Sequence, residues 1–152
     1  MPFAGQRILA QDFTPAQFAS DGTDHLNITT TLTTGSPVVS VTFTAPTSGK
    51  VMIIVGARVR DDGNQSTPII DWELREDDAA GAVVLSTGNE ARRMEILTDN
   101  STRTQNDTKS YIATGLTPGQ VYYAQMYHAV GAGGGTTADV LFRQLAAVPL
   151  PA

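Results

Sequence analysis

Apolar and polar residues alternate with a period of two along most of the chain from Leu26 onward. Such alternation is typical of β-strands that bury one face. The longest run, 51–60, has five apolar residues on one face: Val51, Ile53, Val55, Ala57 and Val59. The other face of this run is apolar at Met52 and Ile54. We therefore expect a central strand whose outer face is covered by another subunit or by the N-terminal segment.

Turn-rich segments separate about eight such runs, which predicts an all-β fold. The expected architecture is a single antiparallel β-sandwich, of jelly-roll or immunoglobulin/fibronectin-like type, over residues 21–152. Its core is expected to contain four large or central side chains, namely Phe43, Val55, Trp72 and Tyr122. Residues 98–108 hold almost no apolar side chain and are expected to form an exposed loop.

The run 116–122, Leu-Thr-Pro-Gly-Gln-Val-Tyr, resembles the turn and strand that carry the tyrosine corner of fibronectin type III and related sandwiches. By this resemblance the Tyr122 hydroxyl would hydrogen-bond back to the backbone. In the strand that follows, Tyr123 and Tyr127 are expected to point outward, with Tyr111 nearby. These three side chains are candidate receptor or subunit contacts, either as a platform for stacking sugar rings or as part of a subunit interface, because tyrosine offers a large apolar area with a polar tip. Ordinary cross-strand pairing on a half-exposed sheet is the alternative.

Residues 1–20 differ from the rest and are predicted to form a short N-terminal arm. The sequence 14–17, Thr-Pro-Ala-Gln, has the pattern of a capping box and predicts one or two helical turns. The arm has more apolar side chains than it can bury alone, so they must pack on the sandwich or on a neighbouring subunit. Together with two residues of the run 51–60, they are the predicted oligomer or attachment contacts: Phe3, Ile8, Leu9, Phe13, Phe18, Met52 and Ile54.

Charge and composition narrow the range of partners. The chain carries 10 Lys+Arg against 15 Asp+Glu, and this acidic balance argues against nucleic acid as a partner. No apolar run approaches the roughly 20 residues of a membrane-spanning helix. The N-terminus shows no apolar segment of signal-peptide length, so we expect synthesis in the cytoplasm of the producing cell.

Few residues could support chemistry. There is no cysteine, and His25 and His128 lack the spacing of a metal motif, so we interpret both as surface or strand-end histidines. The acidic runs 61–62 and 76–78 could serve glycoside hydrolysis or bind Ca²⁺, but Asp and Gly are also the residues that turns prefer. We therefore predict no catalytic residue, no metal, no cofactor and no enzymatic activity.

Three segments, 4–13, 42–51 and 115–119, resemble small β-sandwich proteins of tailed bacteriophages. The resemblance implies a non-enzymatic structural protein on the virion surface, such as a head-decoration, head-fibre, minor tail or receptor-binding protein. Its partners would be other copies of itself, commonly in a homotrimer, and further capsid or tail proteins. The alternative is a carbohydrate-binding or receptor-binding adhesin module that recognises a host-surface glycan. The lack of a secretion signal counts against that alternative.

Overall fold

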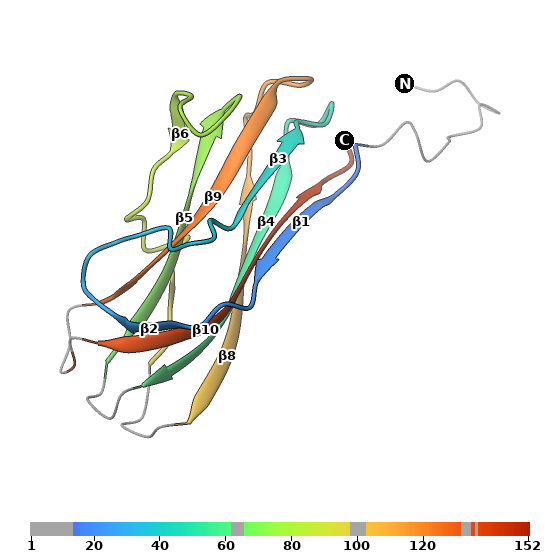
Figure 1. Ribbon diagram of the computed structural model, residues 1–152. Helices are drawn as coiled ribbons and strands as arrows, with labels where there is room; N and C mark the ends of the chain where they lie inside the picture. Colours follow the sequence, from blue (N-terminus) through green and yellow to red (C-terminus); the bar gives the residue numbers. More distant parts are fainter. Residues whose placement is uncertain (1–13, 62–65, 98–102, 132–134, 136) are drawn as a thin grey trace.

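The computed structural model describes residues 14–61, 66–97, 103–131, 135 and 137–152. This part of the chain forms two five-stranded sheets that pack face to face and contains no helix (Figure 1). Sheet A has the order β1 (Gln17–Asp21), β10 (Ala138–Pro149), β4 (Val51–Asp61) and β8 (Thr104–Ala113), and β2 (His25–Ile28) also pairs with β10. Sheet B has the order β3 (Ser40–Thr44), β9 (Val121–Val130), β5 (Pro68–Glu76) and β6 (Val83–Leu85), and β7 (Met94–Glu95) pairs with β5. All these pairings are antiparallel, which confirms the predicted β-sandwich.

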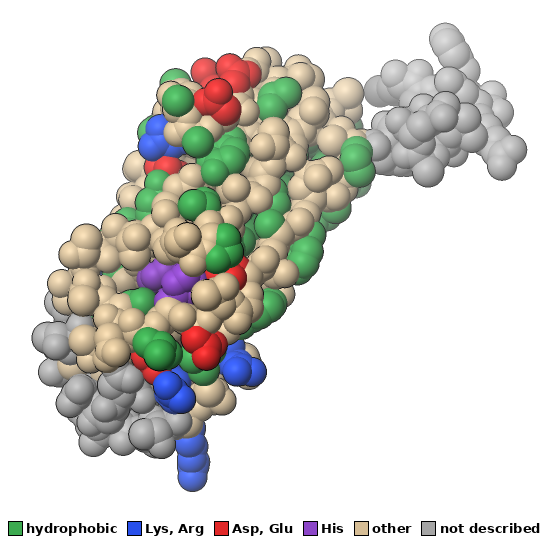
Figure 2. Space-filling model, in the orientation of Figure 1, with side chains coloured by type: hydrophobic (Ala, Val, Ile, Leu, Met, Phe, Trp, Pro, Cys, Tyr) green, Lys and Arg blue, Asp and Glu red, His purple; other side chains and the backbone are tan. Residues whose placement is uncertain are grey.

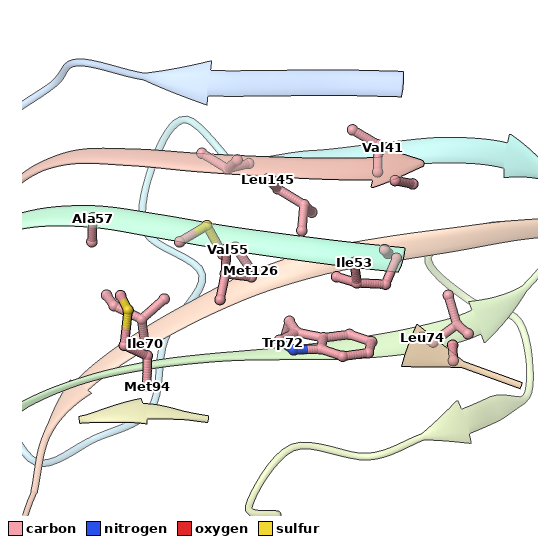
Figure 3. Packing of buried hydrophobic residues seen from close by; sticks show 14 of the residues in the cluster. Val41, Ile53, Val55, Ala57, Ile70, Trp72, Leu74, Met94, Met126 and Leu145 are labelled. Atoms are coloured by element: carbon pink, nitrogen blue, oxygen red, sulfur yellow. The ribbon is translucent and has the colours of Figure 1, made fainter. Parts of the chain in front are cut away.

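The core lies between the sheets and is built from the inward-facing residues of the long strands. Phe43, Val55, Trp72 and Tyr122 are all buried, as predicted. Figure 3 shows the indole of Trp72 on β5 facing the side chains of Ile53 and Val55 on β4. The Tyr122 hydroxyl accepts a hydrogen bond from the backbone N–H of Thr117 at 3.0 Å, so the predicted tyrosine corner is confirmed.

The helix predicted at the end of the N-terminal arm is wrong. Residues 17–21 form β1, which pairs with β10 along its whole length, and Pro15 lies just before the strand. A helix of one or two turns is marginal because few of its backbone groups are paired. Pairing with β10 satisfies the backbone groups along one side of all five residues. The sheet thus begins within the predicted arm, and residues 1–13 lie outside the described residues.

Two other local predictions also need correction. Residues 104–108 belong to β8 rather than to an exposed loop, because β8 is held by its backbone pairing with β4 and needs few apolar side chains. Residues 98–102 of the predicted loop lie outside the described residues. Leu26 begins the alternation seen in the sequence but is exposed, whereas Ile28 is buried. Between them Asn27 has a φ of 52°, a left-handed conformation that interrupts the alternation of the strand.

Candidate functional site

The outer face of sheet A is apolar towards the end where β4 begins. The strand register places Phe18, Ala146 and Ile54 in one row across the sheet. The next row contains Val148, Met52 and Ile112. We call these six residues the apolar face, and they are Phe18, Met52, Ile54, Ile112, Ala146 and Val148.

Two members of the apolar face are strongly solvent-exposed. Phe18 is 64% exposed and Ile112 is 50% exposed, while the other four are partly exposed. Figure 2 shows hydrophobic side chains along the margin that sheet A forms. The face therefore leaves apolar surface in contact with water across four neighbouring strands.

The structure brings three of the predicted contact residues together. Phe18, Met52 and Ile54 come from two strands but lie in adjacent rows of one face. Phe3, Ile8, Leu9 and Phe13 lie outside the described residues. The contact role of all seven stays a prediction.

Sequence reasoning missed the other half of the apolar face. Ile112 lies beyond the predicted loop 98–108 and was assigned to no strand, because β8 has few apolar side chains to reveal its alternation. Ala146 and Val148 share a face with Ile54 and Met52 only through the pairing of β10 with β4, which no local pattern reveals. The alternation of the buried Leu145 and Ala147 with Ala146 and Val148 indicates only that the latter two share one face of their own strand.

The outer face of sheet B carries a network of polar side chains instead. Arg75 donates from Nε to Glu73 Oε1 at 2.8 Å, and the Tyr127 hydroxyl donates to the same oxygen. Tyr123 donates to Gln125 Oε1 at 2.9 Å. These polar groups thus find their partners within the face itself.

The network shifts the ionisation of its members. Burial raises the pKa of Tyr127 to about 12, and the hydrogen bond to Glu73 acts in the same direction. Burial would also raise the pKa of Glu73, but the hydrogen bonds from Arg75 and Tyr127 outweigh it and leave that pKa below its ordinary value. Glu73 is therefore an ionised acceptor and Tyr127 a neutral donor at neutral pH.

The three tyrosines singled out in the sequence do not lie together. Tyr123 and Tyr127 share the outer face of sheet B. Tyr111 is on β8 in sheet A, opposite the inward-facing Ile53, and its ring centroid lies 6.0 Å from that of Trp72. Tyr111 thus packs against the core, and a platform made of all three rings is excluded.

A cluster of charged and polar side chains lies between the sheets, and we call it the buried charge cluster. It consists of Asp21 on β1, His25 on β2, His128 on β9 and Arg143 on β10. Arg143 is completely buried and donates from Nη2 to Asp21 Oδ2 at 2.6 Å. His25 Nε2 lies 2.9 Å from the same carboxylate oxygen.

Both histidines were expected at the surface or at a strand end. His128 lies two residues before the end of β9, but it is not at the surface, since only 1% of it is exposed. Arg143 was not recognised as an inward residue. A β-bulge between Val140 and Phe142 shifts the alternation of β10, so that the inward side chain beyond the bulge is Arg143. A single sequence has no local pattern that marks such a shift, so the bulge could not be predicted.

The electrostatics of the cluster follow from its burial. Desolvation lowers the pKa of His128 to about 4, and the adjacent Arg143 adds to the effect. Arg143 Nη1 lies 3.2 Å from His128 Nδ1, and because a guanidinium only donates, this nitrogen must accept. Burial alone would raise the pKa of Asp21, but hydrogen bonds from Arg143 and His25 hold it well below its usual range.

The cluster also anchors the chain between β2 and β3. Arg143 donates to the carbonyl of Pro37 at 2.7 Å and to that of Thr34. Gly35 has a φ of 70°, and a Cβ there would lie 2.7 Å from Cε1 of His128. Only glycine fits this approach without displacement. Each ionisable group of the cluster thus has a partner inside it, although the Nε of Arg143 is buried without a hydrogen-bond partner in the part of the chain that the structure describes.

Within the described residues, no group of three or more His, Asp or Glu side chains is placed to share a metal ion. The same part of the chain holds no helix long and apolar enough to cross a membrane.

No protein-family model matches the chain, and no match is found among curated proteins. Among solved structures, the chain is similar to chains from infectious bursal disease virus, in the Gt strain (TM-score 0.46, 8% identity) and the Gx strain (TM-score 0.43, 12% identity). These alignments cover 90% of this chain and 32% and 33% of the viral chains. The chain thus spans about a third of their length. It is also similar to the CBM22-1 xylan-binding domain from Paenibacillus barcinonensis Xyn10C, with a TM-score of 0.39, 9% identity, and coverage of 88% of this chain and 87% of that domain.

Proposed function

We propose that this protein is a non-enzymatic structural component of a bacteriophage virion, on the capsid or the tail, and that it assembles as a homotrimer through the apolar face of sheet A. The apolar face is the observation that carries the proposal. The virion location rests on the resemblance of three sequence segments to small β-sandwich proteins of tailed phages. The role is one of protein–protein contact with other copies and with neighbouring virion proteins.

The energetics of the apolar face support a covering partner. Complete burial of a large apolar side chain contributes about 1.5 to 3 kcal/mol. Phe18 and Ile112 are mostly or half exposed in the single chain, so each would gain part of this amount in an interface. Contiguous exposed apolar patches are a feature of protein interaction sites.

The state of the ionisable groups supports a role without catalysis. His128 is neutral and accepts from Arg143, and Glu73 is bound by Arg75 and Tyr127. A general acid or base must lie within hydrogen-bonding distance of a substrate proton, and these groups are already hydrogen-bonded to neighbouring side chains. We expect that the protein releases no reducing sugar or peptide from host cell-wall preparations. Release of either product that is abolished by Glu76→Gln would contradict this.

Light scattering and native mass spectrometry on the full chain test the assembly. Ile54→Lys places a charge in the middle of the apolar face, and Thr42→Lys places the same charge on the exposed outer side of β3 in sheet B. We expect trimers for the unmodified chain and for Thr42→Lys, and monomers for Ile54→Lys. A monomeric unmodified chain, or an Ile54→Lys variant that still assembles, would refute the proposal. Co-purification of the chain with phage particles tests the virion location separately.

A further inference from the structure

A shallow pocket of about 350 Å³ opens on sheet A, towards the end where β4 finishes. Its lining residues come from β4, β8, β10 and the turn after β1, and they are Gly22, Asp24, Arg58, Asn106, Leu141 and Phe142. Leu141 is buried and Phe142 is partly buried, so together they supply an apolar base. Asp24, Arg58 and Asn106 are exposed and supply polar groups around it.

The bulge in β10 creates this combination. At the bulge two residues, Leu141 and Phe142, lie opposite the single residue Arg58 of β4. Asn106 pairs with Arg58 from the other side, on β8. A bulge that turns a side chain away from the regular alternation is a frequent feature beside binding sites. Here it adds an aromatic side chain to a polar row of the sheet.

The polar groups of the pocket lack partners of their own. In the described part of the chain, Asp24, Arg58 and Asn106 form no side-chain hydrogen bond or ion pair. By contrast, Arg60 pairs with Asp139 and Arg75 pairs with Glu73. The hydrogen-bonding capacity of the three pocket side chains is therefore free for a ligand.

The chemistry of these groups defines the ligand class. An ionised carboxylate only accepts, a guanidinium only donates, and an amide does both. One acid and one base leave the pocket without net charge, so a ligand of either sign would face a like charge. A partly buried phenyl ring favours a ligand with a flat apolar side. From this set we infer that the pocket binds a neutral saccharide, whose hydroxyl groups both donate and accept and whose ring carries a C–H face.

The pocket and the apolar face can act independently. Arg58 lies four residues along β4 from Ile54, which corresponds to about 13 Å in an extended strand. The side chains between them include Gln144, which covers Gly56. Assembly through the apolar face thus leaves the pocket at its border, and the saccharide site does not depend on the oligomeric state.

Titration of the full chain with neutral oligosaccharides of glucose, galactose and N-acetylglucosamine, followed by NMR chemical shifts and calorimetry, tests the inference. Phe142→Leu removes the ring from the pocket. Tyr123→Leu makes a comparable change on the outer face of sheet B and is the matched control. Gly22→Leu adds a side chain at the pocket, where a Cβ meets no atom within 4 Å and the backbone is unstrained. It remains informative should Phe142→Leu fail to fold.

We expect at least one of these saccharides to shift the resonances of pocket residues. Phe142→Leu and Gly22→Leu should each weaken its binding by about tenfold or more, which corresponds to about 1.4 kcal/mol. Tyr123→Leu should leave the affinity unchanged. The inference is overturned if no saccharide of the panel binds, or if Tyr123→Leu weakens binding while Phe142→Leu does not. Light scattering on the same samples reports assembly separately, so failure of one proposal leaves the other standing.

Discussion

The outer faces of the two sheets differ in the side chains that their central strands present: β5 presents ionisable side chains and β4 presents apolar ones. On β5 the outward residues Asp71, Glu73 and Arg75 are ionisable, and each has a partner within sheet B or in an adjoining loop. On β4 the outward residues Met52 and Ile54 are apolar and partly exposed. A polar face with internal partners is stable in water by itself. An apolar face gains free energy only when something covers it.

The comparison shows that position on an outer face does not by itself determine how exposed a side chain is. Glu73 is 6% exposed, although it lies on an outer face, because Tyr127 and Arg75 cover and bind it. Phe18 is 64% exposed, although it is fully apolar. Under the proposed function, sheet A is the side that meets a partner and the polar face of sheet B stays in solvent.

The largest expected effect is the loss of stability when an arginine is removed from inside the sandwich, compared with removal of an arginine from the face of sheet B. Arg143→Met leaves Asp21 buried without its cation, and breaking a buried pair in this way costs about 3 to 5 kcal/mol. Arg75→Met removes an arginine of the partly exposed network and should cost clearly less, since Glu73 keeps Tyr127 as a donor. Chemical denaturation of both variants measures the free energies of unfolding. Equal losses would contradict the distinction between interior and face.

The second prediction uses pH to test the same interior. The pKa of His128 is about 4 in the folded chain and about 6.5 when unfolded, so between these values the unfolded chain binds a proton that the folded chain does not. The contribution of neutral His128 to the free energy of unfolding is therefore present in full above about pH 6.5. It should fall by up to about 3 kcal/mol as the pH drops to 4. Asp21 extends the loss to lower pH, because its folded pKa is also depressed.

Urea denaturation at a series of pH values measures this loss. His128→Gln cannot titrate, so its stability should change less between pH 6.5 and 4 than that of the unmodified chain. An identical pH dependence for both proteins would show that another group is responsible.

The third prediction separates assembly from folding on the apolar face. Phe18→Ser should change the stability of the isolated chain by no more than about 0.5 kcal/mol, because Phe18 is mostly exposed there. It should weaken association by about 1 to 2 kcal/mol per subunit contact if Phe18 becomes buried, because only its exposed part remains to be covered. Sedimentation at several concentrations gives the second quantity and thermal unfolding at low concentration gives the first. An unchanged association constant would remove Phe18 from the interface.

The smallest expected effect is on the face of sheet B. Tyr127→Phe deletes one donor to Glu73, and a lost hydrogen bond of this kind costs about 1 to 2 kcal/mol. The oligomeric state should not change, because this face is expected to remain in solvent. Thermal unfolding and light scattering check the two parts, and dissociation of the oligomer by Tyr127→Phe would reverse the roles assigned to the two faces.

The sequence was informative where a strand keeps strict alternation over many residues. The inward set of β4 and the core positions of Trp72 and Tyr122 could be predicted, because a period of two admits one inward face. The helix at residues 14–17 was a wrong prediction because a local capping pattern competes poorly with a strand partner 130 residues away in the chain, as the pairing Gln17↔Ala147 shows.

The candidate sites could be predicted only in part. Met52 and Ile54 were recognised, because an apolar outer face is visible within one strand. The rest of the apolar face, the buried charge cluster and the pocket depend on which strands pair and in which register. The bulge at Leu141 decides both the burial of Arg143 and the exposure of Phe142, and a single sequence gives no measure of it.

The pairing of β1 with β10 also determines how the molecule responds to mechanical load. Gln17 lies opposite Ala147, so the chain enters and leaves the sandwich at the same end (Figure 1). A pull that separates these two segments would open the backbone hydrogen bonds between the strands one after another from that end. The last connection between the two strands to break would be the ion pair of Asp21 with Arg143, at the far end of β1. The buried charge cluster would thus resist the complete separation of β1 from β10.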